Sequence, residues 1–319
     1  MLNNSTILIT GGTGSFGKAA LKEILRVYTP KKLIVYSRSE FLQHELQQMY
    51  PEEKYPTVRF FLGDVRDVKR LKRALKDVDH VIHAAALKQV PAAEYNPTEA
   101  IKTNIMGAVN LIEACIDCGV KKVIGLSTDK AVNPINLYGA TKLCMEKLLV
   151  AGNHYSNKTL FSVVRYGNVA GSRGSVIPLF RKQAETGNVT VTHPDMTRFW
   201  ITLKRAVEFV LLRLNDMRGG EIFVPQMPSM NILDVAEAIA PKANVTMTGI
   251  RPGEKMHETL ISKDDAHRVS EFEDYYTIHP DIKFFSAKQV KGLNVPPDFE
   301  YTSNGNKWRL TEESLRRML

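Results

Sequence analysis

The residues best suited to acid–base chemistry lie together at positions 127–142, in the sequence STDKAVNPINLYGATK. Tyr138 and Lys142 are four residues apart, so on a helix their side chains share one face. A lysine ammonium, together with a positively charged cofactor ring, stabilises a tyrosine phenolate and lowers a pKa that starts at about 10. Such a pair can take the proton of a substrate hydroxyl while its carbon loses a hydride. Thr128 can hydrogen-bond the same hydroxyl, so we predict Thr128, Tyr138 and Lys142 as catalytic residues.

Asp129 and Lys130 form a second candidate pair directly after Thr128. If desolvation and surrounding cations keep Lys130 neutral, its amine can remove a proton from a carbon next to a ketone. A protonated Asp129 can then hand a proton to a departing hydroxyl group. These steps together eliminate water, so we predict Lys130 as the base and Asp129 as the acid.

A glycine-rich turn, GGTGSFG, follows the strand-like run TILIT and precedes a helical pattern. Gly11, Gly14 and Gly17 recur at three-residue spacing, which allows a tight turn and a close approach of backbone N–H groups to a pyrophosphate. This order of strand, turn and helix is typical of dinucleotide-binding proteins. The predicted cofactor residues of the turn are Gly11, Thr13, Gly14, Ser15, Phe16 and Gly17.

The choice of dinucleotide depends on the end of the second predicted strand. NAD enzymes usually place an acidic residue there on the ribose 2′-OH, whereas this chain has Ser37 and Arg38. The guanidinium of Arg38 can bind a 2′-phosphate, so we predict NADP as the cofactor. The other predicted cofactor contacts are Asp64 and Val65 after the third strand, the small residues Ala84, Ala85 and Ala86 on the fourth, and Tyr138 and Lys142.

Apolar strands alternate with amphipathic helices through the first half of the chain. The predicted strands span residues 6–10, 32–37, 58–64, 80–86, 121–128 and 160–167. The alternation predicts an α/β fold, a Rossmann-type doubly wound parallel sheet. After about residue 168, Pro and Gly become denser and short helices alternate with loops. We predict a dinucleotide-binding domain at residues 1–167, with a return strand near 220–225, and a smaller, partly interleaved, mainly substrate-binding region at 168–319.

The composition favours a globular protein of a reducing compartment. No apolar run approaches the roughly 18 residues of a membrane span, and the first residues show no signal-peptide pattern, so we expect no membrane contact and a cytoplasmic location. The net charge is +9, but the basic residues are dispersed and not interleaved with aromatic ones, which favours small anionic ligands over nucleic acid. Cys115 and Cys118 lie in a helical pattern without a second Cys or His pair, so no metal site is predicted.

The glycine turn and the Tyr-x-x-x-Lys spacing resemble the extended short-chain dehydrogenases/reductases. Within that family, STDKAVNPINLYGATKL (127–143) is similar to the inverting UDP-N-acetylglucosamine 4,6-dehydratases of pseudaminic acid synthesis. The resemblance continues through AAALKQVPAAEYNP (84–97), VVRYGNVAGSRGSVIP (163–178), MTRFWITL (196–203) and GIRPGEKMHE (249–258). Dehydratases of the dTDP-glucose type have Asp-Glu in place of Asp129 and Lys130, and related capsule enzymes tend to have Met in place of Tyr138. The combination in this chain therefore resembles the pseudaminic acid branch.

The resemblance implies a lyase that removes water from UDP-N-acetylglucosamine, inverts C5 and recycles NADP, with a product used for surface or flagellin glycosylation. Arginines suit the substrate pyrophosphate because a guanidinium binds phosphate oxygens in pairs. We also expect a homo-oligomer. The alternatives are a retaining UDP-sugar 4,6-dehydratase, a UDP-sugar epimerase and, more remotely, a non-catalytic NADP-binding regulator. The implied substrate residues are Lys88, Asn168, Ser172, Arg173, Gly174, Ser175, Val176, Thr192, Arg198, Arg251 and Glu254.

Overall fold

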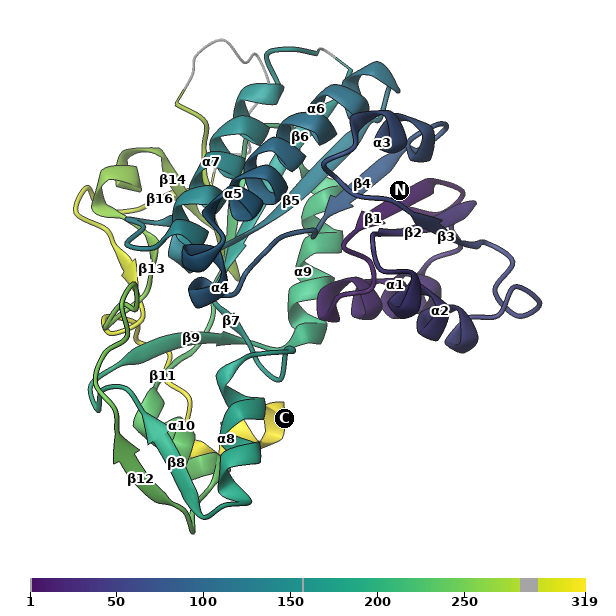
Figure 1. Ribbon diagram of the computed structural model, residues 1–319. Helices are drawn as coiled ribbons and strands as arrows, with labels where there is room; N and C mark the ends of the chain where they lie inside the picture. The colour runs from purple at the N-terminus through teal and green to yellow at the C-terminus, as the bar shows by residue number, and fades with distance from the viewer. Residues whose placement is uncertain (1, 157, 282–291) are drawn as a thin grey trace.

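A twisted β-sheet runs through the centre of the protein and is covered by helices on both faces (Figure 1). The computed structural model describes residues 2–156, 158–281 and 292–319. Within these residues the sheet has ten strands in the order β16-β14-β15-β10-β6-β5-β4-β1-β2-β3. The run β3-β2-β1-β4-β5-β6 is the strand order of a dinucleotide-binding Rossmann fold, so the predicted fold class is confirmed.

The first six strands and β10 are parallel to one another. The strands in the middle of the sheet, β1, β4, β5 and β6, are buried on both faces. Such strands are rich in Val, Ile and Leu because neither face meets water. Their bounds are β1 (Thr6–Thr10), β2 (Lys32–Ser37), β3 (Val58–Leu62), β4 (His80–His83), β5 (Lys122–Thr128), β6 (Leu160–Tyr166) and β10 (Ile222–Pro225).

Three strands from late in the chain extend the sheet beyond β10 with antiparallel pairing. They are β15 (Tyr275–Ile278), β14 (Val269–Glu271) and β16 (Leu293–Asn294). None of these three strands was predicted from the sequence. Each is short, and its residues alone do not indicate which strand it pairs with.

Two groups of helices sandwich the sheet (Figure 1). One face carries α1 (Ser15–Val27), α2 (Glu40–Met49) and α9 (Leu203–Asp216); the other carries α3 (Val68–Ala74), α6 (Gly107–Asp117) and α7 (Leu137–Gly152). The short helices α4 (Val90–Tyr95) and α5 (Pro97–Ala100) and a π-helical turn over Ile101–Met106 precede α6. Helix α6 therefore continues from a π-helical turn, and β3 and β4 are shorter than predicted.

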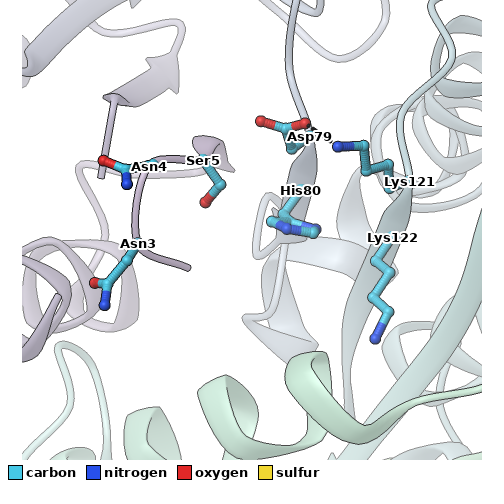
Figure 2. Close-up of a pocket in the computed structure, with 7 residues that line it drawn as sticks. All are labelled: Asn3, Asn4, Ser5, Asp79, His80, Lys121 and Lys122. Carbon is cyan, nitrogen blue, oxygen red and sulfur yellow. Dashed lines mark ion pairs between the residues drawn. The ribbon is translucent and has the colours of Figure 1, made fainter. Parts of the chain in front are cut away.

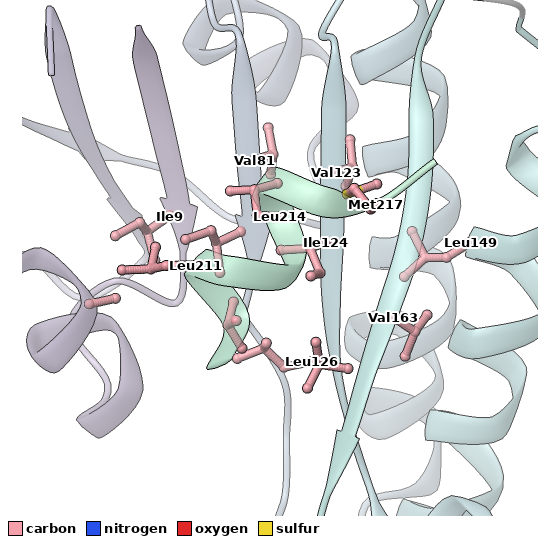
Figure 3. Packing of buried hydrophobic residues seen from close by; sticks show 14 of the residues in the cluster. Ile9, Val81, Val123, Ile124, Leu126, Leu149, Val163, Leu211, Leu214 and Met217 are labelled. Atoms are coloured by element: carbon pink, nitrogen blue, oxygen red, sulfur yellow. The ribbon is translucent and has the colours of Figure 1, made fainter. Parts of the chain in front are cut away.

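Helix α9 belongs to the later half of the chain but packs on the strands of the first half. Leu211, Leu214 and Met217 are buried against the sheet, where Ile9 and Val123 lie (Figure 3). This contact removes the apolar face of the sheet from water, which is the dominant favourable term in folding. The large hydrophobic core is thus built from both halves of the sequence.

A second, smaller hydrophobic core lies below the sheet as drawn in Figure 1, with Trp200 and Phe180 fully buried in it. Short paired strands and helices surround this core. They are β7 (Asn168–Val169), β8 (Asn188–Val191), β9 (Thr197–Ile201), β11 (Ser229–Asn231), β12 (Asn244–Met247), α8 (Val176–Ala184), α10 (Ile232–Ile239) and α11 (Glu312–Met318). The antiparallel pair β13 (Thr259–Ile261) and β17 (Tyr301–Thr302) contributes residues to the larger core.

Candidate functional site

The predicted chemical residues gather where the parallel strands end. Gly11 follows β1, Ala84 follows β4 and Thr128 ends β5, so their positions share the carboxyl edge of one sheet. Ligands of open α/β sheets bind at this edge, next to the point where the strand order reverses. Here that point lies between β1 and β4.

The turn after β1 has the shape that a pyrophosphate requires. Gly11 has a φ of +64°, and a Cβ built there would lie 2.8 Å from the backbone nitrogen of Ala85. A Cβ on Gly17 would lie 2.4 Å from Cα of Gly12, so a side chain would force the turn away from the helix. Gly14 is the N-cap of α1 and provides no side-chain cap, which leaves helix N–H groups available to an anion. The turn therefore fits a dinucleotide.

Arg38 lies at the carboxyl end of β2, and its guanidinium is 4.0 Å from the carboxylate of Asp64. Burial alone would raise the pKa of Asp64, but hydrogen bonds from Arg66 hold it below its ordinary value. The side chain of Ser37 is buried and accepts a hydrogen bond of 3.0 Å from Gln43. Arg38 is the more exposed of the two predicted specificity residues and can reach a ligand.

The loop Ala84–Lys88 is held by a residue that the sequence analysis did not single out. The side chain of Asn104, in the π-helical turn, accepts from the N–H of Leu87 at 2.8 Å and donates to its carbonyl at 2.9 Å. It also donates to the hydroxyl of Thr141 on α7 at 2.9 Å. Asn104 thereby ties the loop beside the glycine turn to the helix that carries Tyr138 and Lys142. No sequence signal marks Asn104 for this role, because it stands among other polar residues in the turn IKTNIM.

Tyr138 and Lys142 both lie on α7, as their spacing predicts, and burial shifts the pKa values of both. Burial raises the pKa of Tyr138 to about 12, against the opposing charge of Lys130. Burial lowers the pKa of Lys142 to about 8, against the attraction of Glu146. The ammonium of Lys142 lies 3.0 Å from the sulfur of Met145. Burial outweighs the nearby cations of the protein, so the predicted lowering of the Tyr138 pKa depends on the positive charge of the cofactor ring and stays a prediction.

Lys130 is held between two carboxylates. Its ammonium is 3.0 Å from Asp129 Oδ1 and 3.0 Å from Glu258 Oε1, and Thr128 donates to the same Asp129 oxygen at 2.8 Å. Burial alone would lower the pKa of Lys130, but Asp129 and Glu258 raise it above its ordinary value. The expectation of a neutral lysine among cations is therefore wrong for this arrangement. Glu258 ends the segment 249–258, and no role was predicted for it.

Three of the implied substrate residues join this cluster. Asn168 Oδ1 is 3.5 Å from the Lys130 ammonium, and Arg198 lies 3.8 Å from Glu258 and 3.5 Å from Glu254. Partial burial and then the charge of Lys130 lower the pKa of Lys88, so this residue also approaches the cluster.

The segment 249–258 reaches across from the smaller core to the catalytic helix. Asn136, the N-cap of α7, donates to the carbonyl of Gly253 at 2.8 Å, and the Lys255 ammonium donates to the carbonyl of Val132 at 2.5 Å. These bonds hold the segment in the position where Glu258 lies beside Lys130 and Glu254 lies beside Arg198.

The other implied substrate residues lie outside these contacts. The N–H of Arg173 donates to Ser15 Oγ at 3.2 Å, so the loop before α8 touches the glycine turn. Ser172, Gly174, Ser175 and Val176 belong to the same loop and the first turn of α8. The hydroxyl of Thr192 donates to the sulfur of Met196. Arg251 is exposed, and its N–H donates to Glu254.

A hollow of about 270 Å³ lies at the opposite end of the strands (Figure 2). Its lining residues precede β1 or stand at the start of β4 and β5, where Lys121 pairs with Asp79 at 2.8 Å. The catalytic candidates are at the carboxyl ends of these strands, so this hollow is separate from them. The residues labelled in Figure 2 are Asn3, Asn4, Ser5, Asp79, His80, Lys121 and Lys122.

Residues 7–280 match the family model described as Polysaccharide biosynthesis protein. The chain belongs to this family. It is 52% identical to the inverting UDP-N-acetylglucosamine 4,6-dehydratase of Campylobacter jejuni, with 100% of this chain and 98% of that protein covered. The resemblance stated from the sequence motifs is thereby confirmed. The chain is also 40% identical to a UDP-glucose 4-epimerase of Rickettsia akari, with 100% and 96% covered.

Two solved structures place the fold among known proteins. Pen from Bacillus thuringiensis superposes with a TM-score of 0.91 at 36% identity and covers 99% of this chain and 97% of its own. DesIV, a dTDP-glucose 4,6-dehydratase from Streptomyces venezuelae solved with NAD and TYD, gives a TM-score of 0.72 at 22% identity, with 79% and 86% covered. The second likeness supports the fold alone.

Two further properties concern the described part of the chain, residues 2–156, 158–281 and 292–319. None of its helices combines the length and apolar character needed to cross a bilayer. The same residues contain no group of three or more His, Cys, Asp or Glu side chains arranged to hold a metal ion.

Proposed function

We propose that the protein is an NADP-dependent UDP-N-acetylglucosamine 4,6-dehydratase that inverts C5, and hence a lyase. The observation that carries this proposal is the Asp129–Lys130 pair beside Tyr138 at the carboxyl edge of the sheet. An oxidation needs only the tyrosine and the lysine of α7, whereas a second acid–base pair suits removal of water. The 52% identity over the full chain to an enzyme of that name supports UDP-N-acetylglucosamine as the substrate.

The chain offers a complete set of residues to hold the dinucleotide. The glycine turn and the N-terminus of α1 suit the pyrophosphate, and Arg38 suits a 2′-phosphate. Asp64 and Val65 are proposed beside the adenine, and Ala84–Ala86 beside the rest of the cofactor. A dinucleotide held by these residues would supply a hydride acceptor for C4 and a hydride donor for C6, and the positive charge of its oxidised ring would favour the Tyr138 phenolate.

Tyr138 and Thr128 act on the C4 hydroxyl in this proposal. Thr128 hydrogen-bonds to Asp129 and interacts with Tyr138, so its hydroxyl can orient the substrate oxygen between them. Tyr138 takes the hydroxyl proton as C4 becomes a ketone. Lys142, on the same face of α7, keeps positive charge near the cofactor ribose.

Lys130 and Asp129 act on C5 and C6. The C4 ketone makes the C5 proton acidic; the C5–H bond breaks, the proton passes to the Lys130 amine and the electron pair enters an enolate. In the reactive form one proton has passed from the Lys130 ammonium to the adjacent Asp129 carboxylate, so the amine is neutral and the carboxyl is an acid. Asp129 donates this proton to the C6 hydroxyl, which leaves as water while the enolate electron pair forms the C5–C6 double bond. Asp129 Oδ2 is buried and has no hydrogen-bond partner among the described residues, so one carboxyl oxygen is available for this step. After C6 of the conjugated ketone has received a hydride, the resulting enolate is protonated at C5 from the opposite face, which inverts C5.

The remaining residues are proposed to bind the nucleotide sugar. We divide the chain into a dinucleotide-binding part, residues 1–167 with β10, and a mainly substrate-binding part, residues 168–319. Arg198 and Arg251 suit the pyrophosphate, whereas Lys88 and Asn168 lie nearer the sugar. We further propose a homo-oligomer that works in the cytoplasm at the first step of pseudaminic acid synthesis.

A UDP-sugar 4-epimerase is the second candidate, because relatives named UDP-glucose 4-epimerase are 40% identical over the whole chain. An epimerase returns its hydride to C4 and has no step that removes a C6 hydroxyl. The Asp129–Lys130 pair would then have no reaction to perform. A retaining dehydratase would use the pair but return the C5 proton from its original face.

Proton NMR separates these candidates. The purified protein is incubated with UDP-N-acetylglucosamine deuterated at C4, in ordinary and in deuterated water. We expect loss of one water, a new C6 methyl group that carries the C4 deuterium, and solvent deuterium at an inverted C5, with no external NADPH consumed. Deuterium returned to C4 would identify an epimerase, and retention at C5 a retaining dehydratase.

A further inference from the structure

Glu258 is buried beside Lys130 although it lies far from it in the sequence. Its side chain is 2% exposed, and Oε1 is 3.0 Å from the Lys130 ammonium. Its backbone N–H donates to Ser303 Oγ at 2.9 Å, and the carbonyl accepts from the N–H of Ser303 at 2.8 Å. Glu258 is therefore fixed by its backbone, and its carboxylate is directed at the ammonium of Lys130.

The other charges around Lys130 do not replace Glu258. Asp129 supplies a second carboxylate from the adjacent position, at 3.0 Å. Arg198, on β9, lies 3.8 Å from Glu258 and opposes the effect of the carboxylates on Lys130. The titratable or charged groups that face Lys130 from its own and neighbouring elements are Asp129, Glu258, Arg198, Lys88, Lys255 and Tyr138.

We propose that Glu258 is a positioning residue for the C5 step, which holds the Lys130 amino group in place and sets how readily it gives up its proton. This inference rests on the proposed dehydratase function. Only the neutral amine can remove the C5 proton. A carboxylate at 3.0 Å stabilises the ammonium, so the neutral amine forms only at higher pH. The same ion pair holds the Lys130 side chain in one orientation inside the site. Glu258 itself touches neither C5 nor C6 in this role.

The test compares the pH dependence of C5 exchange in the parental protein and in Glu258→Gln. The single-turnover rate of solvent deuterium incorporation at C5 is measured with UDP-N-acetylglucosamine across the pH range in which both proteins are folded. In the parental protein the rate should still rise at the alkaline end. In Glu258→Gln the exchange rate should level off at a pH at least about one unit lower than in the parental protein, which corresponds to a roughly tenfold loss of proton affinity at Lys130. The rate at the plateau should also be lower, because Lys130 is no longer held in place.

Two further variants make the result specific. Glu254→Gln removes a carboxylate from the same segment that pairs with Arg198 at 3.5 Å, so it should not move the pH at which exchange levels off, whatever its KM. Glu258→Asp draws the carboxylate back from Lys130 and should shift the profile in the same direction by less. It also serves as the test if Glu258→Gln does not fold.

The outcomes separate the two proposals. Exchange in the parental protein with an unshifted profile in the folded Glu258 variants overturns the role of Glu258 alone. An equal shift in Glu254→Gln also overturns it, because the effect would then be one of total charge. If the parental protein exchanges no hydrogen at C5, the dehydratase function fails and the role of Glu258 fails with it.

Discussion

Charged side chains of both signs meet in the buried part of the site and offset one another. Asp129 and Glu258 are nearly inaccessible to water, and Lys130 and Arg198 lie against them. Moving an ion out of water costs several kcal/mol unless a partner of opposite charge and further hydrogen bonds replace the solvent. Each carboxylate also has one buried oxygen without a hydrogen-bond partner among the described residues. The cluster thus keeps its charges through mutual pairing, although one oxygen of each carboxylate has no partner among these residues.

Arg38 decides the preference between the two dinucleotides in our proposal. Arg38→Ala should weaken NADP binding roughly 10- to 100-fold, because a hydrogen bond to a charged group contributes about 1.5–3 kcal/mol. Binding of NAD should change little, since it has no 2′-phosphate. Titration of both cofactors by isothermal calorimetry measures the two affinities directly.

The matched control is Arg59→Ala, on β3. Arg59 is similarly exposed, and its guanidinium donates to the carbonyls of Pro56 and Val58. This variant loses the same charge and should keep the parental preference for NADP. Equal losses of NADP and NAD affinity in Arg38→Ala would contradict the proposal that Arg38 binds the 2′-phosphate.

Among the elements, those with a strong local pattern were predictable and those defined by distant pairing were not. The parallel strands read as apolar runs, and α1 and α9 have clear apolar faces, so the sequence predicted them closely. The π-helical turn that carries Asn104 has no periodic signal of its own. Strands β14 and β16 each need a partner from elsewhere in the chain. Glu258 was missed for the same reason, because Lys130, its partner, belongs to a remote segment.

Helix α9 should stabilise the fold through one side of its surface only. Leu214 is fully buried against the sheet, whereas Leu212, two residues earlier, is 45% exposed. Leu214→Ala should lower the free energy of unfolding by about 2–5 kcal/mol, because it removes buried apolar contacts and leaves a cavity. Leu212→Ala should change it by no more than about 0.5 kcal/mol. Urea unfolding followed by circular dichroism measures both, and similar losses in the two variants would contradict the packing of α9.

At the scale of the whole molecule, the two halves of the chain complete one another. Strand β10 and helix α9 come from after residue 168 but belong to the large core, while Glu254 and Glu258 return from the later half to the catalytic edge. A division by sequence position therefore describes the proposed binding roles better than it describes the packing. The sequence predicted the interleaving from the single strand-like run near 220–225, but not how much of the later half joins the main sheet.

The stability of the whole fold should fall in acid because it buries neutral histidines. Burial lowers the pKa of His80 to about 4, whereas its ordinary value is 6.5. Between these values the unfolded chain binds a proton that the folded chain does not, so the free energy of unfolding is highest above pH 6.5 and decreases toward pH 4.

One such group contributes a slope of up to about 1.4 kcal/mol per pH unit. His80→Gln should lower the slope of the urea-unfolding free energies across that range by up to about this amount, while His83, whose pKa burial lowers to about 3, continues to contribute. His44→Gln, at an exposed position of α2, is the matched control and should keep the parental slope. His80 lies at the amino edge of the sheet, away from the catalytic residues, so dehydration above pH 6.5 should persist in the variant. A parental slope in His80→Gln would mean that His80 is already solvated in the folded protein.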